Sequence, residues 1–157
     1  MKVTTLNYES TSHEVMKRFQ NLVTSAIEIN KMNRQLYSKE KWVFSPVQYA
    51  KEFCTVHINC GRRIGKTEYI RDFLEVGDVV IVPNRTMQLK SIDVLRWRHI
   101  FIPNDCGNGL PVHFLQDYKP RTIWFDEIGF SSKEEIDWVY NAFCDNTYEQ
   151  TWIRLGQ

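Results

Sequence analysis

The segment of residues 54–75 constrains the fold of this chain more than any other part of its sequence. A run rich in apolar and β-branched residues (CTVHIN, residues 54–59) leads into the loop CGRRIGKT (residues 60–67), and a helical pattern follows over residues 68–75. Gly65 lets the backbone approach a ligand closely, and successive N–H groups beside a helix N-terminus form a concave anion site. The segment therefore predicts a strand, an anion-binding loop and a helix, in that order.

The loop matches the phosphate-binding P-loop pattern G-x-x-x-x-G-K-[ST] except at its first position, where Cys60 replaces glycine. In that pattern the lysine reaches the β- and γ-phosphates of a nucleoside triphosphate, and the threonine hydroxyl binds Mg²⁺. The alternative is a turn that happens to contain Gly-Lys-Thr, but the strand before the loop and the helix after it favour a P-loop. The expected nucleotide-binding residues are Gly61, Arg62, Arg63, Ile64, Gly65, Lys66 and Thr67.

A second motif, RTIWFDE at residues 121–127, is a short apolar strand that ends in two carboxylates. In P-loop NTPases an aspartate at such a strand end helps to hold Mg²⁺, and a glutamate beside it can activate water as a general base. The alternative is a solvated acidic turn. Because the pair follows the loop by about sixty residues of strand–helix units, we expect Thr67 and Asp126 as metal ligands and Glu127 as a catalytic base.

Strands and helices alternate along the chain after Trp42. Apolar runs predict strands over residues 78–83, 122–125 and 151–155, and capping patterns predict helices that begin near Ser45, Asn84 and Ser132. Residues 94–121 are ambiguous, with WRHIFIP and LPVHF as possible strands around a DCGNG turn. The alternation predicts an α/β fold with a mostly parallel sheet flanked by helices. Ligands of such sheets bind at the carboxyl ends of the strands.

The residues before Trp42 have a helical pattern. The capping box Thr11-Ser12-His13-Glu14 predicts the start of a helix over roughly residues 12–36. Its expected apolar stripe consists of Val15, Phe19, Leu22, Ala26 and Ile29. We therefore expect an N-terminal helical segment, residues 1–43, packed on a core formed by residues 44–157.

The composition is that of an ordinary globular protein, with 157 residues of which 43% are apolar and 25% charged. No apolar run reaches the ~18 residues that a membrane span needs, and the first residues do not have a signal-peptide pattern. These features predict a cytoplasmic location and no membrane partner. Residues 122–157 carry seven acidic and two basic side chains, so the rest of the chain is basic. This asymmetry permits a polyanionic partner without requiring one.

The two motifs together resemble the large-terminase ATPases, the motors that package DNA into phage heads. That family often lacks the first glycine of its variant Walker A loop and carries an early arginine there, as in GRRIGKT (residues 61–67). TIWFDEIGF (residues 122–130) is similar to its Walker B strand with the following catalytic glutamate. The resemblance covers residues 44–157 and has no counterpart of the nuclease domain. It implies a P-loop NTPase fold of the additional-catalytic-glutamate class, in which the last strand lies between the P-loop strand and the Walker B strand.

The same resemblance implies a Mg²⁺-dependent ATPase that acts on double-stranded DNA in the host cytoplasm, within a homo-oligomeric ring or with a portal or packaging partner. It makes Arg62 a candidate arginine finger, whereas the role of Arg63 stays open. Gln48 is either an adenine-reading residue or the third residue of a capping box. Arg85, in VPNRTMQ, is either part of a segment that couples to DNA or a surface residue. Gln157, in TWIRLGQ, is either the γ-phosphate sensor or a frayed chain end.

Two other functions fit parts of the sequence. A small nucleotide or nucleoside kinase would fit the length, but it predicts an acceptor pocket and has no need of Glu127. A non-catalytic, nucleotide-gated binding module would also fit the length, but it does not account for the intact set of Lys66, Thr67, Asp126 and Glu127. ATP turnover separates the module from the ATPase, and stimulation by DNA separates a motor from a kinase.

Overall fold

A parallel sheet forms the centre of the molecule. The computed structural model describes residues 3–95, 99–109 and 118–157, and the strands among them form one all-parallel sheet in the order β1-β5-β4-β2-β3. After each strand the chain therefore returns to the opposite end of the sheet before the next strand begins. The strands are β1 (Thr55–Ile58), β2 (Val79–Ile81), β3 (Ile100–Phe101), β4 (Thr122–Asp126) and β5 (Thr151–Leu155).

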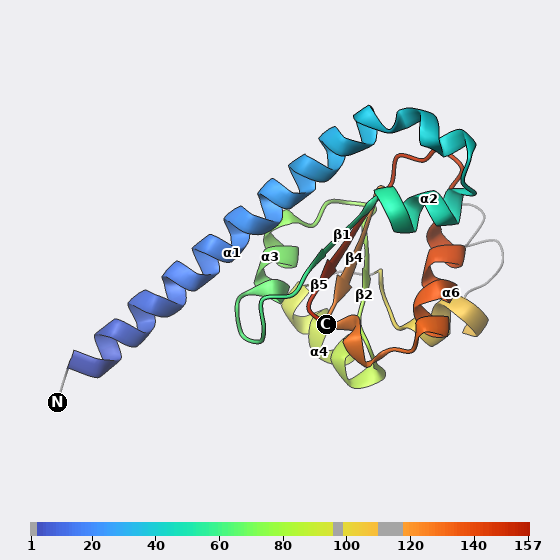
Figure 1. Cartoon of the computed structure of the whole chain (residues 1–157). Coiled ribbons are helices and arrows are strands. Elements are labelled where there is room, and N and C mark those ends of the chain that lie inside the picture. Colours follow the sequence, from blue (N-terminus) through green and yellow to red (C-terminus); the bar gives the residue numbers. More distant parts are fainter. Residues whose placement is uncertain (1–2, 96–98, 110–117) are drawn as a thin grey trace.

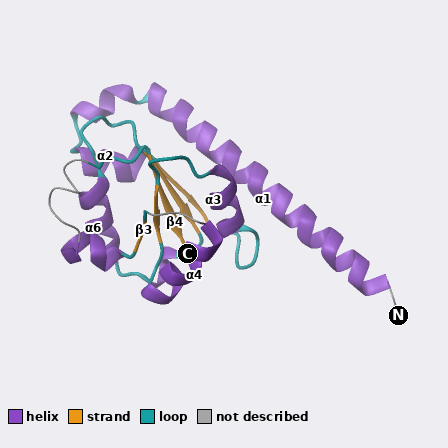
Figure 2. Cartoon of the chain, turned by 180° about the vertical axis from the view of Figure 1, so that it is seen from behind, coloured by secondary structure: helices purple, strands orange, loops and turns teal. Residues whose placement is uncertain are grey.

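Helices cover both faces of this sheet (Figures 1 and 2). Helices α1, α3 and α4 pack on one face, and α2 and α6 on the other, each over its own cluster of buried apolar residues. The molecule is thus an α/β protein with three layers. The helical elements are α1 (Val3–Leu36), η1 (Ser38–Trp42), α2 (Pro46–Phe53), α3 (Lys66–Phe73), α4 (Arg85–Leu95), η2 (Asp105–Gly109), η3 (Ile128–Phe130) and α6 (Lys133–Phe143).

The register of the three strands at one side of the sheet aligns their carboxyl ends. Leu155 of β5 is opposite Ile58 of β1 on one side and opposite Asp126 of β4 on the other. The segments that follow β1 and β4 therefore leave the sheet at the same edge. The expected position of the last strand, between the strands of the two motifs, is confirmed.

Local hydrogen bonds explain where several elements begin. Ser45 and Gln48 form the capping box expected at the start of α2, and Ser132 and Glu135 form the one expected at α6. In each, the hydroxyl accepts from the N–H of the third helical residue, whose side chain in turn accepts from the N–H of the serine. Asn84 caps α4 by accepting from the N–H of Met87 at 3.0 Å.

The segment before β4 agrees only in part with its prediction. WRHIFIP contains the two-residue strand β3, whereas DCGNG forms the helical turn η2 and not a simple turn. The candidate strand LPVHF lies outside the described residues.

The prediction for the first helix is wrong in two respects. Helix α1 begins at Val3, so Thr11 lies inside it and not at its N-cap. Of the expected stripe, Phe19 is buried and Ala26 packs on the core, while Val15, Leu22 and Ile29 are exposed. The apolar side chains of α1 that pack on the core are Phe19, Val23, Ala26 and Ile27. The buried face is therefore rotated from the expected stripe, because the sequence does not reveal which of two adjacent apolar rows meets the sheet.

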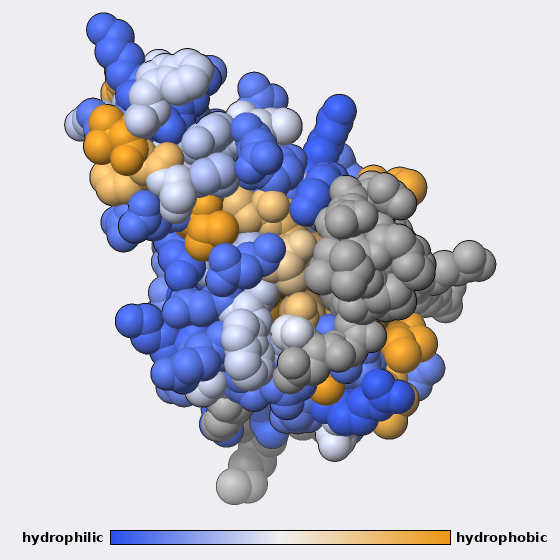
Figure 3. All heavy atoms as spheres, turned by 90° about the vertical axis from the view of Figure 1, so that its right-hand side faces the viewer, coloured by the Kyte–Doolittle hydropathy of each residue, from blue (hydrophilic) through white to orange (hydrophobic). Residues whose placement is uncertain are grey.

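The described helices include none that combines the length and the apolar character needed to span a bilayer. Hydrophilic side chains cover much of the face shown in Figure 3, and hydrophobic ones occur there in small groups.

The buried face of α1 can be tested by substitution. We expect Phe19→Ala to lower the free energy of unfolding by about 3 kcal/mol, because Phe19 is 4% exposed and its ring meets that of Tyr69 edge to face. Asn21→Ala, two residues along the same helix and exposed, should change it by less than about 0.5 kcal/mol. Urea unfolding measures both values, and equal effects would contradict the packing of α1 on the sheet.

Candidate functional site

The fold brings the two sequence motifs together at the carboxyl edge of the sheet. The Thr67 hydroxyl donates a hydrogen bond of 2.7 Å to Oδ2 of Asp126, although 59 residues separate them in sequence. The Lys66 ammonium forms an ion pair with Glu127 and donates to the carbonyl oxygen of Gly61 at 2.7 Å. The four side chains expected to carry the chemistry therefore form one cluster.

The loop of residues 60–67 has a tightly curled backbone. Gly61 and Gly65 have φ angles of +93° and +90°, and Arg63 also has a positive φ of +56°. Left-handed residues between ordinary ones turn successive N–H groups toward one side, which is the geometry of an anion-binding concavity. The loop leads directly into the first turn of α3, whose N–H groups carry partial positive charge. Its shape is therefore suited to an anion such as phosphate.

Helix α1 contacts this loop, and no pattern in the sequence indicated the contact. A Cβ added to Gly65 would lie 3.2 Å from Cε of Met16, closer than an ordinary van der Waals contact. Gly65 thus combines a left-handed backbone with a close neighbour. The contact explains why the position favours glycine, independently of any ligand.

Asp126 is in an unusual electrostatic environment. Its side chain is fully buried, and this burial raises its pKa above the ordinary carboxyl value, while the hydrogen bond from Thr67 acts in the opposite direction. Its Oδ1 atom is also buried and has no hydrogen-bond partner among the described residues. A buried carboxylate oxygen without a partner is costly unless a cation or donor occupies the space beside it.

The residues at this point fit a Mg²⁺ ion held mainly by a substrate. The Thr67 hydroxyl and the unpaired Asp126 oxygen are oxygen ligands of the kind that Mg²⁺ prefers. No group of three or more His, Cys, Asp or Glu side chains in the described part of the chain is placed to hold a metal. The ion would therefore take its other ligands from phosphate and water, as Mg²⁺ usually does in phosphate sites.

Glu127 has a strained backbone conformation and lies beside Gly156, the residue that follows β5. It has φ +54° and ψ +43°, a region that costs a non-glycine residue of the order of 1–3 kcal/mol. Its N–H donates to the carbonyl oxygen of Leu155 at 3.0 Å. A Cβ on Gly156 would lie 2.7 Å from Oε2 of Glu127. Gly156 was not predicted as a site residue. The sequence feature that could have indicated it is its position directly after a strand, at the edge of the sheet where ligands bind.

The remaining candidates lie at different places. Arg62 and Arg63 are exposed on the loop, with no hydrogen bond or ion pair to the described residues. Gln157 is exposed after β5, at the same edge as Glu127. Gln48 lies in α2, before the amino end of β1, and the loop follows the carboxyl end (Figure 1). The structure thus shows the capping role of Gln48 and does not bring it to the loop. Arg85, at the start of α4, donates to Gln88 at 2.9 Å.

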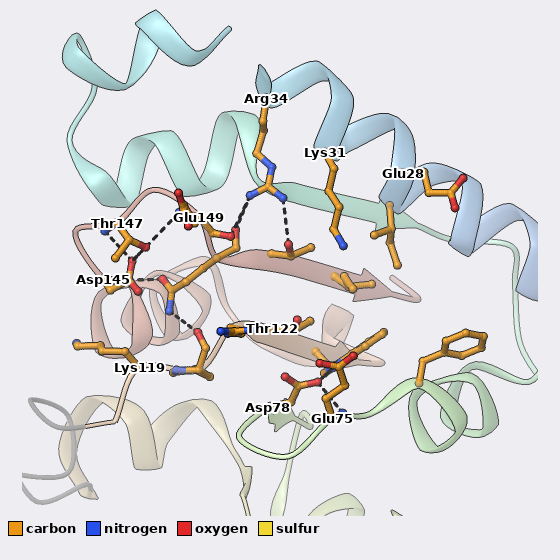
Figure 4. Close-up of a pocket in the computed structure, with 18 of the residues that line it drawn as sticks. Glu28, Lys31, Arg34, Glu75, Asp78, Lys119, Thr122, Asp145, Thr147 and Glu149 are labelled. Carbon is orange, nitrogen blue, oxygen red and sulfur yellow. Dashed lines mark hydrogen bonds between the residues drawn. The ribbon is translucent and has the colours of Figure 1, made fainter. Parts of the chain in front are cut away.

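A cavity lies at the opposite edge of the sheet from the loop. It has a volume of about 820 Å³ and is bordered by α1 and by the amino ends of β4 and β5 (Figure 4). Arg34 at its rim donates to the carbonyl oxygens of Glu149 and Gln150. Both acidic and basic side chains border it, and none of the four clustered residues at the loop does. Size alone therefore does not make it the centre of the chemistry.

Comparisons with models of protein families, with curated proteins and with solved structures found no match to this chain. The function of the site is therefore inferred from its own geometry and chemistry.

The contact between Gly156 and Glu127 generates a prediction with a matched control. Gly156 and Gly77 both have positive φ angles, +106° and +95°, but a Cβ on Gly77 meets nothing within 4 Å. Alanine at Gly77 should lower the free energy of unfolding by about 1–3 kcal/mol through backbone strain. Alanine at Gly156 should cost roughly 1 kcal/mol more, because its Cβ would also lie 3.3 Å from the backbone Cα of Glu127, which cannot turn away as the carboxylate can. Urea unfolding of both variants measures the difference, and equal costs would contradict the close approach.

Proposed function

We propose that the loop of residues 60–67 is a P-loop and that the protein binds ATP with Mg²⁺ and hydrolyses it. The observation that carries this proposal is the hydrogen bond of 2.7 Å between Thr67 and Asp126. It joins a hydroxyl at the start of a helix to a buried carboxylate at the end of a parallel strand, which is the pair of ligands that P-loop NTPases use for Mg²⁺. The unpaired Oδ1 of Asp126 supports the same interpretation.

Lys66 exchanges partners in this proposal. Without nucleotide, its ammonium contacts Glu127 and the carbonyl oxygen of Gly61, and it is only 6% exposed. The N–H groups of the loop bind the phosphates, and Lys66 turns to the β- and γ-phosphate oxygens. Thr67 and Asp126 would hold a Mg²⁺ ion, which would neutralise part of the phosphate charge.

Glu127 is the general base. When Lys66 leaves it, the carboxylate no longer has a cation beside it and can accept the proton of a water aligned with the γ-phosphate. Its strained backbone and the space left by Gly156 fix its direction. In this proposal Arg62, which is exposed on the same loop, neutralises charge on the transferred phosphoryl group.

The resemblance of both motifs to large-terminase ATPases extends the proposal to duplex DNA. The exposed Arg62 and Arg63 add positive charge at the nucleotide edge, which suits either phosphate of the nucleotide or a DNA backbone. In this extension ATP hydrolysis drives the translocation of double-stranded DNA, in a ring of subunits or with a portal or packaging partner. The small-kinase alternative would place an acceptor near the γ-phosphate and leave Glu127 without a role.

The roles of Lys66 and Glu127 are tested by paired substitutions. Glu127→Gln should keep ATP binding and lower hydrolysis by about 10²–10⁴-fold, because a general base is lost. Lys66→Ala should weaken ATP binding by at least ~10-fold, because charged hydrogen bonds to phosphate are lost. Phosphate release and binding of a fluorescent ATP analogue measure these effects. Glu134→Gln and Lys133→Ala, both exposed on α6, are the controls. A fully active Glu127→Gln would exclude the general-base role, and unchanged binding by Lys66→Ala would exclude the P-loop.

The DNA partner is tested separately in the same assay. Duplex DNA should raise the steady-state rate of ATP hydrolysis, and the effect should weaken steeply with salt, because phosphate contacts release counterions. Phosphate transfer to a nucleoside or nucleotide, in place of water, would instead support a kinase. ATP hydrolysis that DNA leaves unchanged at every salt concentration would contradict the DNA extension and leave the ATPase proposal in place.

A further inference from the structure

Helix α1 carries a row of exposed large apolar side chains at heptad spacing. Five of them follow one another at intervals of seven residues, and Met32 lies three residues after the fourth. We call these six side chains the α1 seam. Their exposed fractions range from 40% to 80%. The members are Tyr8, Val15, Leu22, Ile29, Met32 and Leu36.

The α1 seam is distinct from the face of α1 that packs on the sheet. The apolar side chains of the helix that pack on the core are Phe19, Val23, Ala26 and Ile27, and successive residues of a helix differ by about 100° in direction. Val23 thus points about 100° away from Leu22. The helix therefore has two apolar faces, of which the core uses one.

The amino-terminal part of α1 extends away from the sheet. Figure 1 shows it reaching well beyond the other elements, and every side chain from Tyr8 to Val15 is exposed. Isolated helices shorter than ~12–15 residues are marginal in water, and helices in proteins gain most of their stability from packing an apolar face. A second helix along the seam would supply that packing.

One heptad position of α1 is apolar along its whole length. Residues seven apart stay on one side of a helix when two helices wind around each other with a left-handed twist. The seam runs from Tyr8 to Leu36, which is about 42 Å at 1.5 Å per residue. The second position that a coiled coil makes apolar holds Thr11, Arg18, Ser25 and Met32 here, so the seam is a single row with one additional apolar member.

We propose that α1 pairs with α1 of a second copy of this chain through the α1 seam, so that the protein is a dimer held by two helices packed side by side. The six side chains expose on the order of 600 Å² of apolar surface, at ~150–250 Å² for each large side chain. This is at the top of the range of apolar patches on monomers, and it approaches the ~800 Å² that each partner buries in a standard interface.

The charges of α1 allow two copies to meet. The described part of the helix carries nearly balanced acidic and basic side chains, so two copies do not repel each other strongly. Arg18 lies next to the seam, three residues after Val15. It forms an ion pair with Glu14 of the same helix at 2.7 Å. These charges are Glu9, Glu14, Lys17, Arg18, Glu28, Lys31 and Arg34.

The dimer is tested by placing charge in the seam of the full chain. The mass of the wild type in solution, measured by light scattering over roughly 1–100 µM, should be that of a dimer. Leu22→Glu with Ile29→Glu should raise the dissociation constant at least ~100-fold, because two buried contacts per copy are lost. The control, Ser10→Glu with Asn21→Glu, adds the same charge at exposed positions of α1 outside the seam and should remain dimeric. Thermal unfolding by circular dichroism should show that both variants stay folded.

A cysteine placed in the seam gives a second, independent measurement. Leu22 is the middle residue of the heptad row, so two copies of it meet whether the helices run parallel or antiparallel in register. In a Cys60→Ser background, which removes the exposed native thiol, Leu22→Cys should form an intermolecular disulfide and Ser10→Cys should not. A monomeric wild type up to 100 µM, or a dimer that the two seam glutamates leave intact, would overturn the proposal. So would equal cross-linking at both cysteine positions.

Discussion

The parallel register of β1, β5 and β4 is the constraint on which the candidate site depends. Both Ile58 and Asp126 are level with Leu155, so the loop after β1 and the end of β4 emerge at one edge with a single strand between them. Neighbouring strands lie about 4.8 Å apart, which leaves roughly 10 Å between β1 and β4. The loop and the first turn of α3 curl back over this gap, and Thr67 reaches Asp126. A strand order with more strands between β1 and β4 would have left the two motifs too far apart to touch.

Several features at this edge reduce the stability of the folded protein. A buried carboxylate with a raised pKa, an oxygen without a partner and a left-handed Glu127 each cost free energy. Single features of this kind also occur elsewhere: Tyr148 has a left-handed φ of +63°, and burial raises the pKa of Asp78 at the cavity. At the loop, however, backbone strain, an unpartnered carboxylate oxygen and a curled anion-binding backbone occur together. Such clustering is typical of functional sites, where charge and strain are kept for use on a ligand. It supports the loop, and not the cavity at the other edge, as the centre of the chemistry.

Helix α1 connects the proposed site to the proposed interface. Met16 contacts Gly65 in the loop, while Val15, the preceding residue, belongs to the seam. Pairing of two copies would therefore order the segment of α1 that borders the loop. In that arrangement the two faces of one helix have different tasks, since one completes the core and the other holds a second subunit.

The sequence by itself determined the kind of fold and most of the local structure. The alternation of strands and helices, the bounds of β5 and the capping boxes at Ser45 and Ser132 follow from nearest-neighbour chemistry, because period and capping depend on residues a few positions apart. The residues Lys66, Thr67, Asp126 and Glu127 were also identifiable, because their motifs are contiguous.

Only the tertiary structure decided which groups meet. The pairs Lys66–Glu127 and Gly156–Glu127 join distant segments, and no local pattern specifies them. The same holds for α1, whose helical character was predictable but whose buried face was not. Two adjacent apolar rows are equally good candidates for burial in a sequence, and the choice between them is made by the shape of the sheet that the helix meets.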